Sequence, residues 1–228
     1  MTVGRRDVGH DADPAEPAGR RPREGGQSLV EFSLLVPLFM MILFGMIEFG
    51  IAFTHELTIE YAVREGARAG AAITNGGGNL GCSAGQSPNW KTVDPLVIAA
   101  VERVLESPGS QVVVARVSKI VIFKANPVTG ADDQGYHNTW LYSAGAGPIP
   151  QGTPDHLNFV DSSYPDGDGW RACSRSNASP NIDSIGVSIA YTYNFQTPLA
   201  AILGFFGGGS PSLAVTDRTV MDLNPATS

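Results

Sequence analysis

Residues 25–53, GGQSLVEFSLLVPLFMMILFGMIEFGIAF, determine how this chain is organised. Between residues 32 and 53 the sequence is apolar for 22 residues, apart from Ser33 and Glu48. An α-helix of this length measures roughly 33 Å, which is enough to cross a hydrocarbon core of about 30 Å. A helix in the core of a soluble domain would carry a polar face, and this stretch shows none. The sequence therefore predicts a single transmembrane helix over residues 27–53.

Basic residues are concentrated on the N-terminal side of the apolar stretch. Five arginines precede it, whereas only Arg64 and Arg68 fall among the twenty residues that follow. By the positive-inside rule, the N-terminus is cytoplasmic and residues 54–228 form a domain on the other side of the cell membrane. Residues 1–26 balance basic with acidic side chains and hold almost no large apolar ones. We therefore expect them to be a disordered cytoplasmic leader.

A carboxylate, Glu31, stands at the very start of the apolar stretch. At the edge of the hydrocarbon it costs a few kcal/mol unless it is paired. Along the chain, basic residues are followed by glycine, four further residues, glutamate, phenylalanine and then the apolar helix. This order resembles the class III signal of type IV pilin-like precursors. The same part of the chain contains Gly26, Gln27, Glu31, Phe32, Pro37, Glu48, Phe49, Gly50 and the cluster Arg64, Glu65, Gly66, Ala67 and Arg68. On these residues the chain is similar, over residues 25–73, to the TadE-like proteins of tight-adherence pilus systems.

This resemblance implies that a prepilin peptidase cuts the chain between Gly26 and Gln27. The new α-amino group is largely protonated at neutral pH. The Glu31 carboxylate of a neighbouring subunit can pair with it, which lowers the cost of burying both charges and sets the helix register. We expect Phe32 and Glu48 to take part in the same helix packing. The alternatives are that Glu31 and Glu48 only reach toward the membrane interfaces, and that the two glycines are a flexible linker.

Helical periodicity continues beyond the apolar stretch. Glu60 and Arg64 form a favourable i,i+4 pair on the polar side. We expect one helix over residues 28–73, roughly 69 Å long, ended by the glycine-rich residues 75–79. Small and apolar residues recur in it at spacings of three, four and seven, namely Ile59, Ala62, Val63, Gly66, Ala67, Gly70 and Ile73.

The remainder is predicted to be an α+β domain in which a small antiparallel sheet packs on the long helix, as in pilins. Asp94 as the N-cap and Pro95 after it begin a second helix. Residues 111–123, 183–195 and 212–222 have the alternation and composition of strands. The side chains expected to face the core are Val97, Ala100, Val101, Val104 and Leu105 in the helix, and Ile185, Val187, Ile189, Tyr191, Tyr193, Phe195, Leu213, Val215 and Met221 in the strands.

Two segments are ambiguous. Residues 124–182 are rich in Gly, Pro, Asp and Ser. Such a long irregular stretch is variable surface, a contact region for other pilus parts, or a region that hides further strands. Residues 199–206 are apolar but too short to span a membrane. They form either a buried connector or an exposed patch that meets the membrane or another subunit.

Two cysteines, Cys82 and Cys173, fall in the predicted exported domain. In an oxidising compartment their simplest state is a disulfide, which would close a loop of about 90 residues and contribute roughly 4–5 kcal/mol in the chain-entropy model. Neither has a second Cys or His at zinc-ligand spacing. Asp166 and Asp168 lie in a DGDG fragment that lacks the remaining ligands of a calcium loop, so we interpret it as a tight turn.

No catalytic motif appears: the sequence lacks a G-x-S-x-G elbow, an H-E-x-x-H pair and a P-loop. The net charge of −7 also argues against a nucleic-acid partner. We expect no cofactor. The resemblance implies a non-catalytic minor pilin or pseudopilin whose partners are membrane lipid, prepilin peptidase and other pilin-like or pilus-machine subunits. The alternatives are a membrane-anchored extracytoplasmic binding or adhesin domain outside a pilus, an anchored enzyme, and a TadG-like protein.

Overall fold

The computed structural model describes residues 26–73, 93–150, 152–162, 169–207, 209 and 211–224. In chain order its elements are α1 (Gln27–Ile73), α3 (Asp94–Leu105), η2 (Val114–Arg116), β1 (Val117–Ala125), β2 (Asp132–Tyr142), β3 (Phe159–Asp161), η3 (Ala172–Ser174), β4 (Ser184–Asn194), α4 (Leu199–Gly207) and β5 (Ser212–Asp222).

The chain divides into two units, Met1–Met41 and Ile42–Ser228. The described part of the first unit is the beginning of α1. The second unit holds the rest of α1 and the other described helices and strands, and the fold is described for that unit. Residues 1–25 of the predicted leader (residues 1–26) and the predicted helix stop at residues 75–79 lie outside the described residues.

Helix α1 confirms the expected continuity from the apolar stretch into the domain. It begins within one residue of the predicted start, continues through Pro37 and ends at Ile73. The predicted stripe of small and apolar residues is buried from Ile59 to Gly70, with Ile73 partly buried. The Glu60–Arg64 pair forms as expected. Periodicity alone therefore identified which side of this helix faces the domain.

Within the residues that the structure describes, the sheet has five antiparallel strands in the order β3-β2-β1-β4-β5. The predicted α+β arrangement with a small antiparallel sheet is confirmed, but the expectation of three strands was too low. Strands β2 and β3 lie within residues 124–182, so the interpretation that this region hides strands is correct. Strand β1 begins at Val117 rather than at residue 111, because η2 precedes it.

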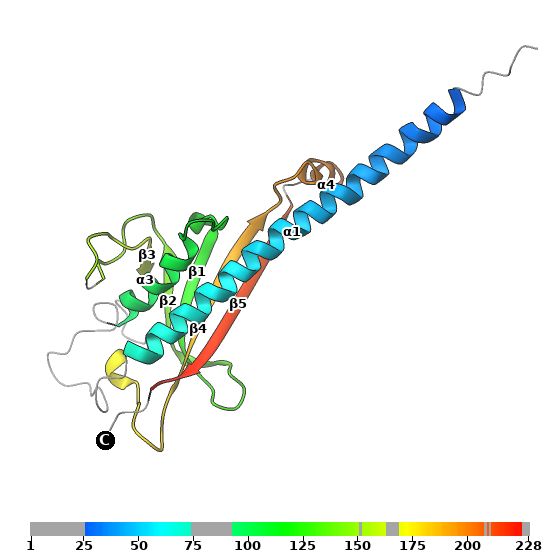
Figure 1. Cartoon of the computed structure of the whole chain (residues 1–228). Coiled ribbons are helices and arrows are strands. Elements are labelled where there is room, and N and C mark those ends of the chain that lie inside the picture. Colours follow the sequence, from blue (N-terminus) through cyan, green and yellow to red (C-terminus); the bar gives the residue numbers. More distant parts are fainter. Residues whose placement is uncertain are drawn as a thin grey trace, which may run out of the picture. The chain divides into compact units, whose positions relative to one another are not determined.

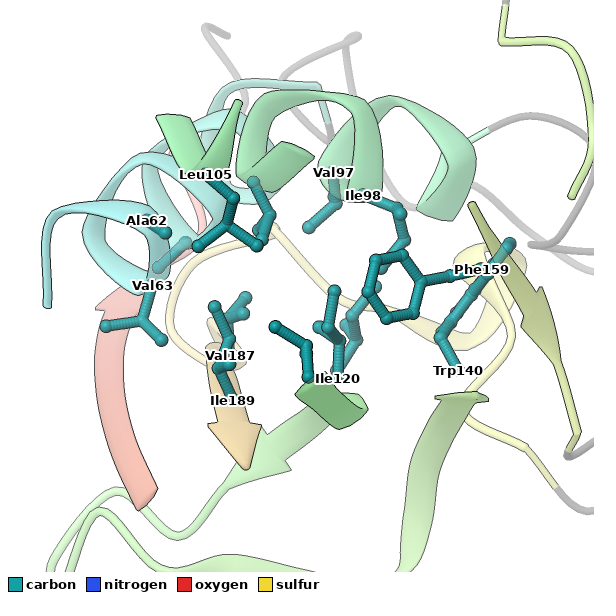
Figure 2. Packing of buried hydrophobic residues seen from close by; sticks show 14 of the residues in the cluster. Ala62, Val63, Val97, Ile98, Leu105, Ile120, Trp140, Phe159, Val187 and Ile189 are labelled. Atoms are coloured by element: carbon teal, nitrogen blue, oxygen red, sulfur yellow. The ribbon is translucent and has the colours of Figure 1, made fainter. Parts of the chain in front are cut away.

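The hydrophobic core lies between the helices and one face of the sheet. Figure 1 shows α3 and the second half of α1 over this face. In Figure 2, helix residues such as Val63 and Leu105 point toward Ile120 of β1 and Val187 of β4. All four are at most 1% exposed. The helices approach closely at Gly66, where an added Cβ would lie 2.6 Å from Cγ2 of Val101.

Two details of the predicted packing were wrong. Asp94 is the first residue of α3 rather than its N-cap; Val93 occupies the cap position without a side-chain hydrogen bond. The Asp94 carboxylate instead binds Arg175 and Asn138. On β5, which is an edge strand, Leu213 is 49% exposed rather than buried. The other predicted core positions are buried or partly buried.

Candidate functional site

The predicted processing site lies at the start of α1. Gly26 immediately precedes the helix, Gln27 is its first residue, and both are exposed. The Gln27 side-chain amide donates a hydrogen bond of 3.0 Å to Glu31 Oε1. Glu31 is exposed, and Phe32 is 68% exposed. Cleavage between Gly26 and Gln27 and the packing roles of Glu31 and Phe32 stay predictions.

The apolar part of α1 presents its side chains to the outside. Its most apolar 18-residue window has a mean hydropathy of 2.3, and only 6% of that window is buried. The helix is therefore long and apolar enough to span a membrane, and it lacks the burial expected of a helix in a soluble core. The large exposed side chains are Leu29, Val30, Phe32, Leu34, Leu35, Leu38, Phe39, Met40, Met41, Ile42, Met46, Ile47, Phe49 and Phe53.

Glu48 is the exception within this apolar stretch, because it is only 2% exposed. The Tyr193 hydroxyl, at the end of β4, donates a hydrogen bond to Glu48 Oε1. The backbone N–H of Gln196 donates to the same oxygen at 2.9 Å, and the N–H of Thr197 donates to Oε2 at 2.7 Å. Burial and the bond to Glu48 raise the pKa of Tyr193, so the phenol stays protonated as a donor. The carboxylate thus joins α1 to the segment between β4 and α4.

His55 follows on the same side of α1, two turns further along. Its Nδ1 lies 3.0 Å from the Tyr191 hydroxyl, and its ring meets Tyr193 edge to face with centroids 5.1 Å apart. Burial, assisted by the positive charge of Arg116, lowers the pKa of His55. The imidazole is therefore neutral at physiological pH, and its contacts with the two tyrosines make it a packing group of the helix–sheet interface.

Sequence reasoning placed Glu48 only in relation to the membrane or a partner helix and did not single out His55 at all. A signal was present: counting back from Ile59 in steps of four and seven gives His55 and Glu48. The buried stripe of α1 therefore begins with two polar residues, and the tyrosines on the inward face of β4 supply their partners. The role of Glu48 in packing between subunits stays a prediction.

A second buried polar cluster joins α3, β2 and the segment before β4. Arg175 is 1% exposed; its Nη2 donates to Asp94 Oδ1 at 2.7 Å and to the Trp170 carbonyl at 3.0 Å. The guanidinium carbon lies 4.4 Å from the centre of the Trp170 ring. The Asn138 amide donates to Asp94 and to the same carbonyl. Each charged group has an opposite charge or a dipole beside it, so the cluster fixes the positions of three segments.

The structure adds no metal site among the described residues and does not test the predicted disulfide. Within the described part of the chain, no group of three or more His, Cys, Asp or Glu side chains is arranged to hold a metal ion. Cys82, Asp166 and Asp168 lie outside the described residues, as does the side chain of Cys173. The Cys82–Cys173 disulfide therefore stays a prediction.

A comparison with protein-family models matches a part of the chain that lies mainly on α1. No curated protein and no solved structure matches the chain. A family model described as TadE-like protein matches residues 26–68, which begin at Gly26 and include Glu31, Glu48 and His55. The resemblance predicted from the sequence is thereby confirmed: over its N-terminal helix, this chain is similar to the TadE-like family.

Proposed function

We propose that the chain is a non-catalytic, single-span TadE-like minor pilin or pseudopilin that contributes to assembly of a tight-adherence (Flp-type) pilus or its secretion machine. The family match over residues 26–68 carries the proposal, because the TadE-like family is associated with tight-adherence pilus systems. The family is generally non-catalytic, which supports a structural or assembly role over that of an anchored enzyme.

In this proposal residues 1–26 are a cytoplasmic leader, residues 27–53 cross the cell membrane and residues 54–228 form the extracytoplasmic domain. The orientation rests on the five arginines that precede the span. The partners are membrane lipid, prepilin peptidase and other pilin-like or pilus-machine subunits. The exposed apolar side chains of α1 support contact with lipid or with other apolar helices.

Processing provides the charge that Glu31 is proposed to pair with. Removal of the leader leaves an α-amino cation on Gln27, one turn of helix before Glu31. Within one chain, Glu31 already accepts a hydrogen bond from the Gln27 side chain, so its second carboxylate oxygen is available to the new amino group of a neighbouring subunit. An offset by one turn or more between adjacent helices then pairs the charges in a fixed axial register.

N-terminal sequencing of the membrane-extracted protein tests the proposal. The chain is expressed with and without a prepilin peptidase, and the sequence is expected to begin at Gln27 only when the peptidase is present. Gly26→Val should abolish the cut, whereas Gly25→Ala, the matched control one residue earlier, should preserve it. A full-length N-terminus in all samples would support the alternative, a membrane-anchored extracytoplasmic binding or adhesin domain that does not enter a pilus.

A further inference from the structure

Helix α4 presents an apolar surface close to the transmembrane stretch. Its nine residues, LAAILGFFG, include no polar side chain. Leu203 is 41% exposed and Phe205 is 85% exposed. Exposed aromatic and aliphatic side chains on a helix without a polar face are costly in water. The sequence left open whether this segment is a buried connector or an exposed patch, and the structure shows that it is exposed at Leu203 and Phe205.

Glu48 fixes the level of α4 along α1. Its carboxylate binds the N–H groups of Gln196 and Thr197, and the Thr197 hydroxyl in turn accepts a hydrogen bond of 3.3 Å from the N–H of Leu199, the first residue of α4. Figure 1 shows α4, in orange, beside α1 at this level. Because Glu48 lies within the 22-residue apolar stretch of residues 32–53, the start of α4 is tied to a part of α1 that is itself predicted to be in the membrane.

The surroundings of Glu48 are consistent with a membrane at this level. A carboxylate facing lipid would cost several kcal/mol, but here three protein donors surround it and remove it from any lipid contact. On α1, the neighbouring residues Met46 and Phe49 are 72% and 74% exposed. The outer surface at this level is therefore apolar on both helices, although the charge is buried between α1 and the segment before α4.

A cationic side chain, that of Arg116, lies beside α4 on the side that faces the end of β4. Half-buried Arg116 lines a cavity together with residues at the end of β4 and on α4, including Phe195, Ala201 and Gly204. An arginine with an apolar stem next to an apolar helix is the arrangement by which proteins reach lipid phosphate while their neighbours enter the acyl region.

We propose that α4 is an interfacial helix that inserts Leu203 and Phe205 into the membrane leaflet on the side of the exported domain, beside the transmembrane part of α1, with Arg116 near the phosphates. Its partner is the lipid surface. The inference rests on the membrane-anchoring part of the proposed function. It also implies that Glu48 and the start of α4 anchor the domain directly against the bilayer.

Tryptophan quenching in lipid vesicles tests this inference on the full chain. Phe205→Trp and Leu203→Trp variants are reconstituted at low protein-to-lipid ratio in phosphatidylcholine–phosphatidylglycerol vesicles whose acyl chains are brominated near the headgroup. Emission is compared with that of the parent chain, whose three tryptophans give the baseline. Part of the added emission should be lost in brominated vesicles for both variants, because an interfacial helix places its apolar side chains at the boundary of the acyl chains. The matched control is Val128→Trp, in the turn between β1 and β2, where the side chain is 90% exposed; its added emission should be unchanged.

A Phe39→Trp variant separates this inference from the proposed anchoring. Phe39 lies in the apolar stretch and is 59% exposed. If bromine placed deep in the acyl chains does not quench this variant, the span itself is absent and the proposed function fails. If Phe39→Trp is quenched while Phe205→Trp and Leu203→Trp behave like Val128→Trp, the membrane anchor stands and the inference about α4 is overturned. The apolar surface of α4 would then be assigned to another protein subunit.

Discussion

Glu48 shows how a charged residue is accommodated in an apolar stretch of helix. Both of its oxygens accept hydrogen bonds, one from a phenol and a backbone N–H and the other from a second N–H. Removing a partner from such a buried charge costs more than the bond contributes, since the charge stays desolvated. The bonds to Glu48 therefore stabilise the contact between α1 and β4.

Tyr193→Phe is expected to lower the free energy of unfolding by about 1.5–3 kcal/mol, because the variant loses a hydrogen bond to a charged acceptor and keeps the ring. Thermal unfolding of the full chain in detergent measures the change. Tyr61→Phe, on the exposed side of α1, is the control and should have no measurable effect, since Tyr61 is 62% exposed. Equal melting temperatures for the two variants would show that the hydroxyl–carboxylate bond does not stabilise the domain.

Glu102 makes the stability of the domain depend on pH. Burial, assisted by repulsion from Glu106 and partly offset by a hydrogen bond from the Asn158 N–H, raises the pKa of Glu102 from 4.5 to about 7. The folded state therefore holds this proton more tightly than the unfolded state does. The stabilisation is complete below pH 4.5 and is lost as the pH rises to about 7.

Glu102→Gln should remove this pH dependence. At about 1.4 kcal/mol for each pKa unit, the native chain is expected to lose about 3 kcal/mol between pH 4.5 and 7 through this group. The variant should show a flatter profile and a higher stability above pH 7 when unfolding by denaturant is followed at several pH values. Glu106→Gln, an exposed neighbour, serves as the control and should retain most of the dependence. A native-like slope in Glu102→Gln would exclude Glu102 as its source.

At the level of single residues, the sequence predicted the apolar contacts better than the polar ones. The buried positions of α1 from Ile59 onward follow from spacing alone, because apolar periodicity directly reflects burial. The hydrogen-bond partners of Glu48 and His55 are 136 or more positions away in the sequence. Those of Asp94 are at least 44 positions away. Local spacing contains no information on such pairs, so Asp94 was assigned a capping role that a local rule suggested.

At the level of elements, the central strands β1 and β4 are held together by an unusual pair. Gly186 of β4 lies opposite Phe123 of β1 in the register. A Cβ added at Gly186 would lie 2.2 Å from the Phe123 ring, which is only 2% exposed. The ring therefore covers the glycine and fills the space that another side chain would occupy.

Gly186→Ala is predicted to destabilise the domain by about 1–3 kcal/mol, because the methyl group forces the ring out of its position. Denaturant unfolding gives the free energy. The same substitution in a Phe123→Leu background is the control, since a smaller flexible side chain leaves room for the methyl group. The cost of Gly186→Ala should be clearly smaller there, and an equal cost in both backgrounds would rule out the ring contact as the cause.

The two strands that sequence reasoning missed show what a local pattern omits. Strand β2, DDQGYHNTWLY, contains few apolar residues, and its inward positions include Asn138, whose amide is bound by the buried polar cluster. Strand β2 is defined by its backbone pairing with β1, and its sequence shows no regular alternation of apolar and polar residues. Strand β3 has three residues, fewer than any periodicity can identify. By contrast, β4 and β5 were found within one residue because their alternation is regular.

At the level of the whole molecule, the second compact unit includes part of the predicted transmembrane stretch of α1. Hydropathy places the boundary near residue 53, whereas the second unit begins at Ile42 and Glu48 belongs to it. The segment that binds Glu48 should therefore depend on residues 42–53.

Hydrogen exchange on two fragments in detergent tests this boundary. The amides of Gln196 and Thr197 should be protected in a fragment of residues 42–228 and exchange at least about tenfold faster in residues 54–228, which lack Glu48. Amides in the centre of β4, such as that of Ile189, should be protected in both fragments and show that the sheet is folded. Equal protection of Gln196 and Thr197 in both fragments would place the domain boundary at residue 53 after all.

The hydrogen bonds of Glu48 also fix the rotation of α1 about its own axis relative to the domain. Successive residues of an α-helix are separated by about 100° around its axis. With Glu48, His55 and Ile59 held against the domain, the stacked rings of Phe49 and Phe53 are directed elsewhere, and both are about half or more exposed. A neighbouring helix can therefore approach only the sector of the α1 circumference that the folded domain leaves uncovered. Inserting one residue between Glu48 and His55 would turn that sector by about 100° and present a different set of side chains to the same neighbour.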